Sequence, residues 1–359
     1  MSVGLWRVAL PLRRPHAAAH GSESVRSLIL VQVGLADGTE GWGECSALER
    51  PTYTAEYTAG AWLVLRDELA PALLEQRTPS IVGHPMALAG VTTAWTDAVL
   101  RREGRSLAAV LAQPLGAAPT ISMPVCAVIG LRGSADDVVA EVAERIEHRV
   151  AMVKLKVTPA REDLVAVQAV RDAWPDLALA VDFNGTADLD ALRWLERLSL
   201  AYVEQPAPAD DLVGSARFAA QVGCPVALDE SVSSVGAFDA AVALGSGSIV
   251  NVKPARCGGP RGAASLVARA RSAGWQAFVG GMVESGVGRA AALAVAALPG
   301  GTLPTDLGPS LAYVDVDLTE PLTTDPSGRI LTPTGPGIGR TPLLDHLEAH
   351  TIDRTTVGE

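Results

Sequence analysis

The stretch ALAVDFNGTADLDALRWLERLSLAYVEQP (residues 178–206) decides the expected fold, because it contains two strand-like runs on either side of a helical segment. The runs Ala178–Phe183 and Tyr202–Pro206 are short and mostly apolar, and each reaches polar residues at its end. Between them, apolar residues recur at the spacing of an amphipathic helix. A strand, a helix and a second strand in this order predict two parallel strands joined by a crossover helix.

The same unit repeats from residue 121 onward, with amphipathic segments such as Ala135–His148 and Glu162–Trp174 between the strands. Eight strands are expected, at Val125–Gly130, Met152–Val157, Ala178–Phe183, Tyr202–Pro206, Val226–Ser231, Ile249–Pro254, Ala277–Val283 and Thr302–Leu307. The count of eight and the polar residues at the C-terminal strand ends favour a closed barrel. An open doubly wound sheet would usually carry a glycine-rich turn after its first strand, and no G-x-G-x-x-G stands there. The predicted fold class is therefore α/β, a modified TIM (β/α)8-type barrel over residues 121–310.

Residues 1–120 follow a different pattern and are expected to form a separate α+β capping domain. Antiparallel strands are expected at Leu28–Gly34 and Gly41–Cys45, around the turn at Asp37-Gly38. Helices are expected at Tyr57–Leu74, Pro85–Arg102 and Leu107–Leu111. The tail, residues 311–359, is rich in Pro, Thr and Gly and contains one expected short helix near Leu343–His350. We expect this tail to pack back on the capping domain and complete it.

Composition and charge limit the partners. Hydrophobic residues make up 48% of the chain and the net charge is −11, with no run rich in Lys and Arg, so neither nucleic acid nor an anionic membrane is an expected partner. The four cysteines form no C-x-x-C pair, which argues against a zinc knuckle and a disulfide scaffold. Met1–Leu12 lacks a basic start followed by an apolar core, and Ala290–Leu298 is too short to cross a bilayer. A cytoplasmic protein is the expectation.

Three consecutive expected strands end in a carboxylate, namely Asp182, Glu204 and Asp229. In a barrel these side chains converge above the axis, where they repel one another unless a cation lies between them. Oxygen ligands with open positions suit Mg²⁺, with Mn²⁺ as a substitute. None of the six histidines stands at a strand end, so a histidine-based zinc site is not expected. Each carboxylate taken alone would be an ordinary helix cap or loop residue, whereas three in equivalent places predict a metal site.

Lysines form the second part of the predicted site. Lys154 and Lys156 alternate with Leu155, so both point to one face of their strand, and Lys253 comes from the opposite side of the ring. They could simply neutralise the acidic cluster. Alternatively, they are acid/base groups facing each other across a carboxylate substrate. The second interpretation has a clear use, because removal of a proton α to a carboxylate needs both a base and a cation that stabilises the enediolate.

As an ordered set, these motifs resemble the enolase superfamily, and more narrowly its muconate-lactonizing subgroup: KLK (154–156), DFN (182–184), VEQP (203–206), LDES (228–231), NVKP (251–254) and GGMVESGVGR (280–289). The segments NVKPARCGG and GGMVESGVGRA are most similar to the o-succinylbenzoate synthase / N-acylamino acid (N-succinylamino acid) racemase family. GWGEC (41–45) and PTGPGIG (333–339) also match, so the resemblance covers essentially the whole chain. Two positions depart from the family, Phe183 and Ala255, and neither removes a catalytic group.

The resemblance implies a role for each lysine. Lys156 would be the general base, and Lys154 would tune it and contact the substrate carboxylate. Lys253 would stabilise the anionic intermediate or act as the second acid/base group. Relatives of the mandelate racemase type use a histidine on the late strands, and no histidine occurs between residues 149 and 345.

Further residues are candidates for substrate contacts or for support of the metal ligands: Asn184, Glu230, Arg256, Glu284 and Ser285. Each of these residues could instead have a purely structural role. Glu230 should point away from the site by strand alternation, although family members often use it in support of the ligands. Arg256 is a candidate to meet a second substrate carboxylate. The segments His16–Arg26 and Leu48–Tyr57 are candidate loops that close over the substrate and set specificity.

The expected reaction is that of o-succinylbenzoate synthase, a dehydration in menaquinone biosynthesis in which Lys156 performs both proton transfers. The alternative is N-acylamino acid / N-succinylamino acid racemase, followed by a muconate-type cycloisomerase or a dipeptide epimerase. All of them use the same three metal ligands and both Lys156 and Lys253. A non-catalytic sugar- or anion-binding barrel should have lost one of these five residues, and none is lost. The partner is a small-molecule carboxylate, and a homo-oligomer is expected.

Overall fold

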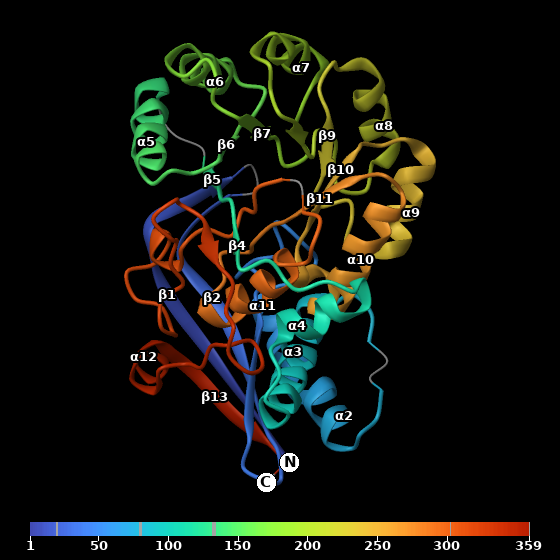
Figure 1. The fold of residues 1–359 in the computed structure, drawn as a ribbon, viewed down its shortest axis with the longest axis vertical. Helices are drawn as coiled ribbons and strands as arrows, with labels where there is room; N and C mark the ends of the chain where they lie inside the picture. The colour runs from blue at the N-terminus through green and yellow to red at the C-terminus, as the bar shows by residue number, and fades with distance from the viewer. Residues whose placement is uncertain (19–20, 79–80, 131–133, 302, 359) are drawn as a thin grey trace.

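The structure is a computed structural model, which describes residues 1–18, 21–78, 81–130, 134–301 and 303–358. Its larger sheet is parallel and seven-stranded (Figure 1). In spatial order its strands are β11 (Gln276–Val279), β10 (Ile249–Val252), β9 (Val226–Leu228), β8 (Val203–Glu204), β7 (Leu179–Asp182), β6 (Met152–Lys156) and β5 (Cys126–Ile129). Spatial order follows sequence order, as the repeated strand–helix unit predicted. The strands are shorter than expected: Lys156, Asp182 and Glu204 are the last paired residues of β6, β7 and β8, and the residues that follow them leave the ladder.

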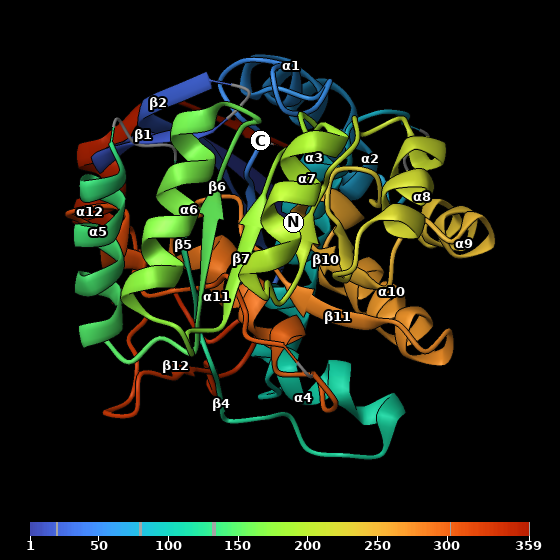
Figure 2. The same ribbon diagram turned by 90° about the horizontal axis from the view of Figure 1, so that it is seen from above.

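The connecting helices lie along the outside of the curled sheet (Figure 2). They are α5 (Ala135–Glu147), α6 (Arg161–Ala173), α7 (Leu189–Leu195), α8 (Leu212–Gln221), α9 (Val235–Leu244), α10 (Pro260–Ser272) and α11 (Gly286–Ala296). Several begin at a side chain that accepts a bond from a backbone N–H of the first turn, such as Ser134, Asp188 and Ser234. Short 3₁₀ turns cover Gln113–Leu115, Glu196–Leu198, Pro254–Cys257 and Ser310–Ala312. The predicted barrel-type α/β architecture is confirmed.

The eighth strand, expected at Thr302–Leu307, is the main correction. Thr302 lies outside the described residues, and residues 303–307 form a single parallel bridge, Val125↔Thr305, instead of a strand. The segment still bonds both neighbours: Cys126 N–H donates to Thr305 O (2.8 Å), and Asp306 N–H donates to Val279 O (3.2 Å). Pro304 has no N–H to donate to a ladder, which explains why regular pairing does not begin before Thr305. The segment thus closes the ring between β5 and β11 without a regular strand.

The capping sheet is antiparallel and four-stranded, in the order β13 (Thr351–Val357), β1 (Ser2–Ala18), β2 (Gly21–Gly34) and β3 (Glu40–Cys45). Both chain ends lie together at its far end (Figure 1). The sequence analysis identified β2 in part and β3 closely, but it missed β1 and β13. β13 pairs with β1, so the tail contributes a strand to this sheet, and a second short pair, β12 (Ile330–Leu331) with β4 (Ser122–Met123), also involves the tail.

Helix α3 (Pro85–Arg102) packs directly on β3. Glycine allows this contact: a Cβ on Gly41 would lie 2.1 Å from the backbone N of Ala98, and one on Gly43 would lie 2.1 Å from the carbonyl O of Gly90. The predicted α3 is confirmed. The helix expected at Tyr57–Leu74 is divided into α1 (Thr58–Val64), a π-helical turn (Leu65–Leu69) and α2 (Ala70–Leu74), while α4 (Leu107–Ala112) and α12 (Leu344–His350) lie close to their expected positions.

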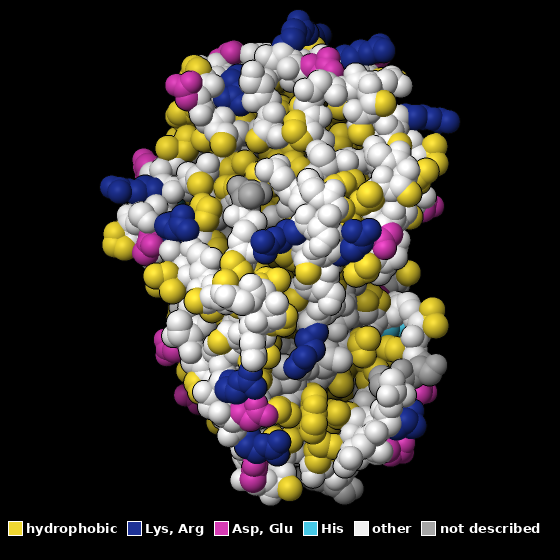
Figure 3. All heavy atoms as spheres, turned by 45° about the vertical axis from the view of Figure 1, so that its right-hand side comes forward, with side chains coloured by type: hydrophobic (Ala, Val, Ile, Leu, Met, Phe, Trp, Pro, Cys, Tyr) yellow, Lys and Arg dark blue, Asp and Glu magenta, His cyan; other side chains and the backbone are white. Residues whose placement is uncertain are grey.

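Surface features are unremarkable on the face shown in Figure 3, where Lys and Arg side chains are spread among Asp and Glu instead of forming one basic patch. Within the described residues, no helix has both the length and the apolar character needed to cross a membrane.

Glu44 joins the capping sheet to the barrel. It lies on β3, is 4% exposed, and its carboxylate accepts bonds from the backbone N–H groups of Ser285 and Gly288 at the start of α11 (both 3.2 Å). It also accepts bonds from the hydroxyls of Ser285 (2.5 Å) and Ser46 (2.7 Å). Burial is the main cause that raises the pKa of Glu44 to about 7, and nearby Glu284 adds to the rise.

We expect Glu44 to make the free energy of unfolding depend on pH. Its pKa is about 7 in the folded chain against an ordinary value of 4.5, so the folded chain binds the proton more tightly. This contribution is complete below the ordinary pKa and is lost as the pH rises through the folded-state value. The pKa difference corresponds to about 3 kcal/mol. In Glu44→Gln, the decline of stability between about pH 5 and about pH 8 should shrink by that amount in urea unfolding.

Glu40→Gln is the matched control, because Glu40 lies on the same strand and is exposed. It should leave the pH dependence of stability unchanged. Parallel pH curves for Glu44→Gln and the unchanged protein would contradict the assignment.

Candidate active site

Three buried carboxylates stand together at the C-terminal ends of neighbouring strands. Asp182 ends β7, Glu204 ends β8 and Asp229 directly follows β9; their exposures are 2%, 0% and 1%. Sheet register brings Asp182 and Glu204 to one level with Lys156, since Lys156 stands opposite Asp182 and Asp182 opposite Glu204, while Asp229 lies two residues beyond the partner of Glu204. Burial and then the neighbouring carboxylates raise the pKa of Glu204 to about 8, against the opposing effect of Lys154. The site therefore concentrates negative charge that a cation would stabilise.

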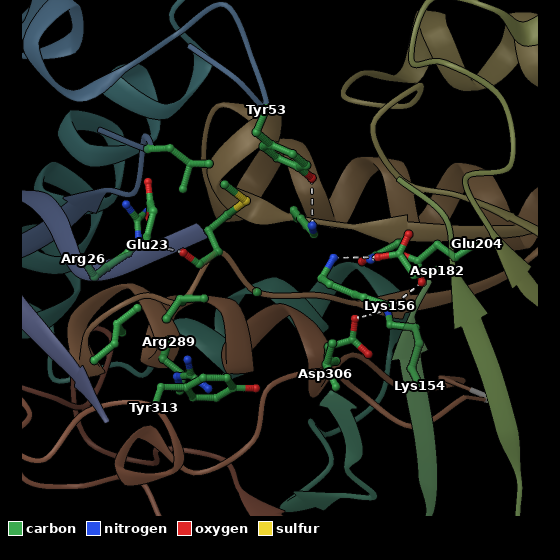
Figure 4. Close-up of a pocket in the computed structure, with 18 of the residues that line it drawn as sticks. Glu23, Arg26, Tyr53, Lys154, Lys156, Asp182, Glu204, Arg289, Asp306 and Tyr313 are labelled. Atoms are coloured by element: carbon green, nitrogen blue, oxygen red, sulfur yellow. Dashed lines mark hydrogen bonds and ion pairs between the residues drawn. The ribbon is translucent and has the colours of Figure 1, made fainter. Parts of the chain in front are cut away.

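Each of the three carboxylates is paired with a lysine, and Figure 4 shows Lys156 beside Asp182 and Lys154 near Glu204. Lys156 Nζ lies 2.8 Å from Asp182 Oδ2, and Lys253 Nζ lies 2.8 Å from Asp229 Oδ2. Lys154 Nζ lies 2.6 Å from both Glu204 Oε2 and Asp306 Oδ2.

A cavity of about 90 Å³ separates the capping sheet from these strand ends and contains Lys154, Lys156 and Lys253 in its lining. Its other wall includes Glu23, Arg26, Leu48 and Tyr53 from the capping half, together with Met282, Val283 and Tyr313. Both segments predicted to close over the substrate thus contribute to the wall, although residues 19–20 of the first lie outside the described part.

The oxygen atoms at this site are of the kind that binds Mg²⁺, but the carboxylates do not converge on one point where an ion could be held. Within the described part of the chain, no three His, Cys, Asp or Glu side chains lie close enough together to hold a metal ion as they stand. The carboxylates instead point to their lysines. Three buried oxygens near them, Asn251 Oδ1, Asp306 Oδ1 and Glu230 Oε2, have no hydrogen-bond partner among the residues that the structure describes. Buried carboxylates that repel one another and unpaired oxygens together make an oxygen-rich environment of the kind that Mg²⁺ prefers.

Asn184 and Glu230 support the site. Asn184 Oδ1 accepts a bond from Lys156 Nζ (2.8 Å), and its Nδ2 donates to Glu230 Oε1 (2.8 Å) and Asp182 Oδ2 (3.2 Å). The prediction that Glu230 points away from the site is wrong. β9 ends at Leu228, so strand alternation no longer sets the direction of Glu230. Burial, then Asp229 and Asp182, raise the pKa of Glu230 to about 7.

The remaining candidates lie behind the cavity. Arg256 donates from Nη2 to the backbone O of Asp229 and pairs with its carboxylate, so the structure places it against Asp229 and not toward a substrate carboxylate. Glu284 accepts a bond from the N–H of Met282 (2.6 Å) and lies 3.5 Å from Arg289. Ser285 caps α11 and bonds Glu44. These residues stabilise the walls of the site.

Two residues were missed by the sequence analysis. Asn251 donates to Glu204 Oε1 (2.7 Å), and its position two residues before Lys253 on the same strand was an available signal. Tyr53 accepts a bond from Lys253 Nζ (2.8 Å) and donates to Asp229 Oδ2 (3.1 Å). No pattern marks Tyr53, because it lies in an irregular loop.

Two known protein-family domains match the two halves of the chain. The enolase C-terminal domain-like family matches residues 137–346, and the N-terminal domain of the mandelate racemase / muconate lactonizing enzyme family matches residues 1–112. The chain belongs to the enolase superfamily. This confirms the resemblance that the strand-end motifs predicted, and members of this superfamily generally use a divalent metal ion.

Relatives of the chain within the enolase superfamily include racemases and o-succinylbenzoate synthases. The chain is 36% identical over 371 residues to N-succinylamino acid racemase of Amycolatopsis sp, covering 99% of this chain and 98% of the relative. It is 32% identical over 348 residues to o-succinylbenzoate synthase of Geobacillus stearothermophilus, covering 93% and 91%. The solved N-succinyl Arg/Lys racemase from Bacillus cereus matches with a TM-score of 0.91 at 26% identity, covering 100% of this chain and 99% of that one. The chain is therefore an enzyme of the lyase or isomerase class.

Proposed function

We propose that this enzyme removes the proton α to the carboxylate of a small-molecule substrate and so forms an enediolate. The observation that carries the proposal is the pair of amines, Lys156 and Lys253, that line one cavity from different strands. The carboxylates Asp182 and Asp229 hold them, 2.8 Å from each nitrogen. A cavity with a base on each side and a cluster of carboxylates between them suits proton transfer at a carbon atom.

Mg²⁺, with Mn²⁺ as a substitute, is the proposed metal, and Asp182, Glu204 and Asp229 are its proposed ligands. When bound, it would stabilise the negative charge that develops on the substrate carboxylate. Lys154 adds positive charge next to Glu204. Asn251 and Asn184 hold Glu204 and Asp182 in place through their side-chain amides.

Lys156 is the proposed base. Its nitrogen bonds Asp182 and Asn184, which fixes the position of the amine, and as the free amine it would take the α-proton from its side of the substrate. Lys253 enters from β10, beyond the three strands that end in carboxylates. It would deliver a proton to the opposite face of the same carbon, or stabilise the anion there.

Among the reactions that share this step and these residues, we place racemisation of an N-succinylamino acid first. It needs proton transfer on both faces and so uses both lysines, and the relative at 36% identity carries that name. Dehydration to o-succinylbenzoate, which the sequence analysis put first, needs proton transfer by Lys156 alone. It remains the second candidate, because relatives at 31–32% identity carry the synthase name.

The test compares two substrates in the presence of Mg²⁺. An N-succinylamino acid in D₂O is followed by α-proton exchange in the NMR spectrum, and the cyclohexadiene-carboxylate precursor of o-succinylbenzoate is followed by its absorbance. Exchange with inversion is expected to be fast, and EDTA should abolish it, with activity restored by Mg²⁺. Fast dehydration with slow exchange would move the assignment to the synthase. Turnover that survives EDTA would contradict the metal-assisted mechanism.

A further inference from the structure

One capping-loop residue contacts the catalytic half directly. Tyr53 lies in the loop between Leu48 and Tyr57, whose ends are joined by a backbone bridge. Its hydroxyl accepts a bond from Lys253 Nζ (2.8 Å) and donates one to Asp229 Oδ2 (3.1 Å). Lys253 Nζ also lies 5.0 Å from the centre of the Tyr53 ring. Figure 4 shows Tyr53 reaching across the cavity from the capping side.

The two lysines are held in different ways. The side-chain partners of Lys156 Nζ in the described structure, Asp182 and Asn184, both come from the barrel half. Lys253 Nζ has one partner from the barrel half, Asp229, and one from the capping loop, Tyr53. Movement of the capping loop therefore removes a partner from Lys253 and leaves both partners of Lys156 in place.

We propose, on the basis of the proposed function, that Tyr53 is a positioning residue for Lys253, so that proton transfer on the Lys253 face occurs only when the capping loop is closed. Lys253 Nζ, Tyr53 Oη and Asp229 Oδ2 form a closed triangle of hydrogen bonds. An ammonium group has three N–H bonds, so two hold it in this triangle and one remains for the substrate carbon.

Asp229 alone cannot fix the amine. Lysine has a flexible four-carbon stem, and a single carboxylate partner allows the nitrogen to swing around it. Asp229 is also a proposed metal ligand and is shared with Arg256. The tyrosine hydroxyl is a second partner of Lys253 that is not itself a proposed metal ligand, and the Arg256 guanidinium lies over the same ring, 5.6 Å from its centre.

The test is Tyr53→Phe, which removes the hydroxyl and keeps the ring. The α-proton exchange of the two enantiomers of one N-succinylamino acid is measured separately in D₂O, and Lys253→Met identifies the enantiomer whose proton faces Lys253. For that enantiomer, exchange in Tyr53→Phe should fall by about tenfold or more through kcat, since misplacement of a reacting group is costly. Exchange of the other enantiomer should stay within about threefold, with KM little changed.

A purely structural role would slow both enantiomers equally, and that result, like unchanged exchange of both, would overturn the proposal. Tyr57→Phe is the matched control from the same loop, because Tyr57 is 38% exposed, and it should change neither rate. The Mg²⁺ affinity of Tyr53→Phe, measured by calorimetry, should equal that of the unchanged enzyme; weaker binding would mean that Tyr53 acts through Asp229. Absence of exchange in the unchanged enzyme would overturn the proposed function and this role together, whereas exchange that is insensitive to Tyr53→Phe would overturn this role alone.

Discussion

Replacing Lys156 with alanine is expected to abolish racemisation in both directions and dehydration as well, with a loss in kcat of about 10²–10⁴-fold. Either direction of racemisation needs Lys156 once, as the base or as the proton donor, and dehydration needs it for each transfer. The nearest alternative amine, Lys154, is held between Glu204 and Asp306. Single-turnover conversion measured at saturating Mg²⁺ would separate this chemical step from product release.

The conservative variant Lys156→Arg separates charge from basicity. An arginine keeps the positive charge beside Asp182 but does not lose a proton at accessible pH. It should therefore leave the unfolding free energy close to that of the unchanged enzyme and still lose the reaction. In Lys253→Ala, racemisation should be lost while exchange on the Lys156 face continues. Full racemisation by Lys156→Ala would refute the assignment of the base.

The barrel half was predictable because the pattern within each strand and helix agrees with the regular repeat of strands and helices along the chain. Apolar runs that end in charged residues repeat at regular intervals, and the register of β6, β7 and β8 then brings Lys156, Asp182 and Glu204 to one level. The capping sheet was less predictable. β1 is broken by Arg7 and the two arginines that follow Leu12, so its apolar alternation at Val3, Leu5, Val8 and Leu10 was not recognised as a strand.

In the candidate site, too, the sequence predicted the directions of side chains within strands but not those of side chains in turns and loops. Strand periodicity correctly brought Lys154 and Lys156 to one side, because both lie within β6. It failed for Glu230, which lies beyond the end of its strand, and it had no information about Tyr53, which reaches the site from an irregular loop. The direction of a side chain in a turn depends on contacts that are distant in sequence, and the hydrogen bond from Asn184 to Glu230 is an example.

Replacing Lys154 with methionine is expected to destabilise the metal-free protein by about 3–5 kcal/mol, because it leaves buried charges without a partner. Lys154 is 2% exposed, lies between Glu204 and Asp306, and its nitrogen is 5.1 Å from the centre of the Phe278 ring. Methionine has a similar length and fits an apolar environment. The decrease in unfolding free energy is therefore due to the missing charge and not to a cavity. Urea unfolding of both proteins in EDTA measures the effect.

The control for this prediction is how the lost stability of Lys154→Met depends on pH and on Mg²⁺. The pKa of Glu204 is already about 8, and removal of the ammonium group should raise it further. Since a raised carboxyl pKa contributes stability that is lost as the pH rises, the deficit of Lys154→Met should be larger at about pH 8 than at about pH 6. The double variant Lys154→Met/Asp306→Asn should recover part of the stability by removing one of the two unpaired carboxylates. Mg²⁺ should stabilise Lys154→Met more than the unchanged enzyme if Glu204 is a ligand, because the ion then replaces the missing positive charge. A deficit below about 1 kcal/mol that is indifferent to pH and Mg²⁺ would contradict the expectation that the Lys154 ammonium group compensates buried carboxylate charge in the metal-free protein.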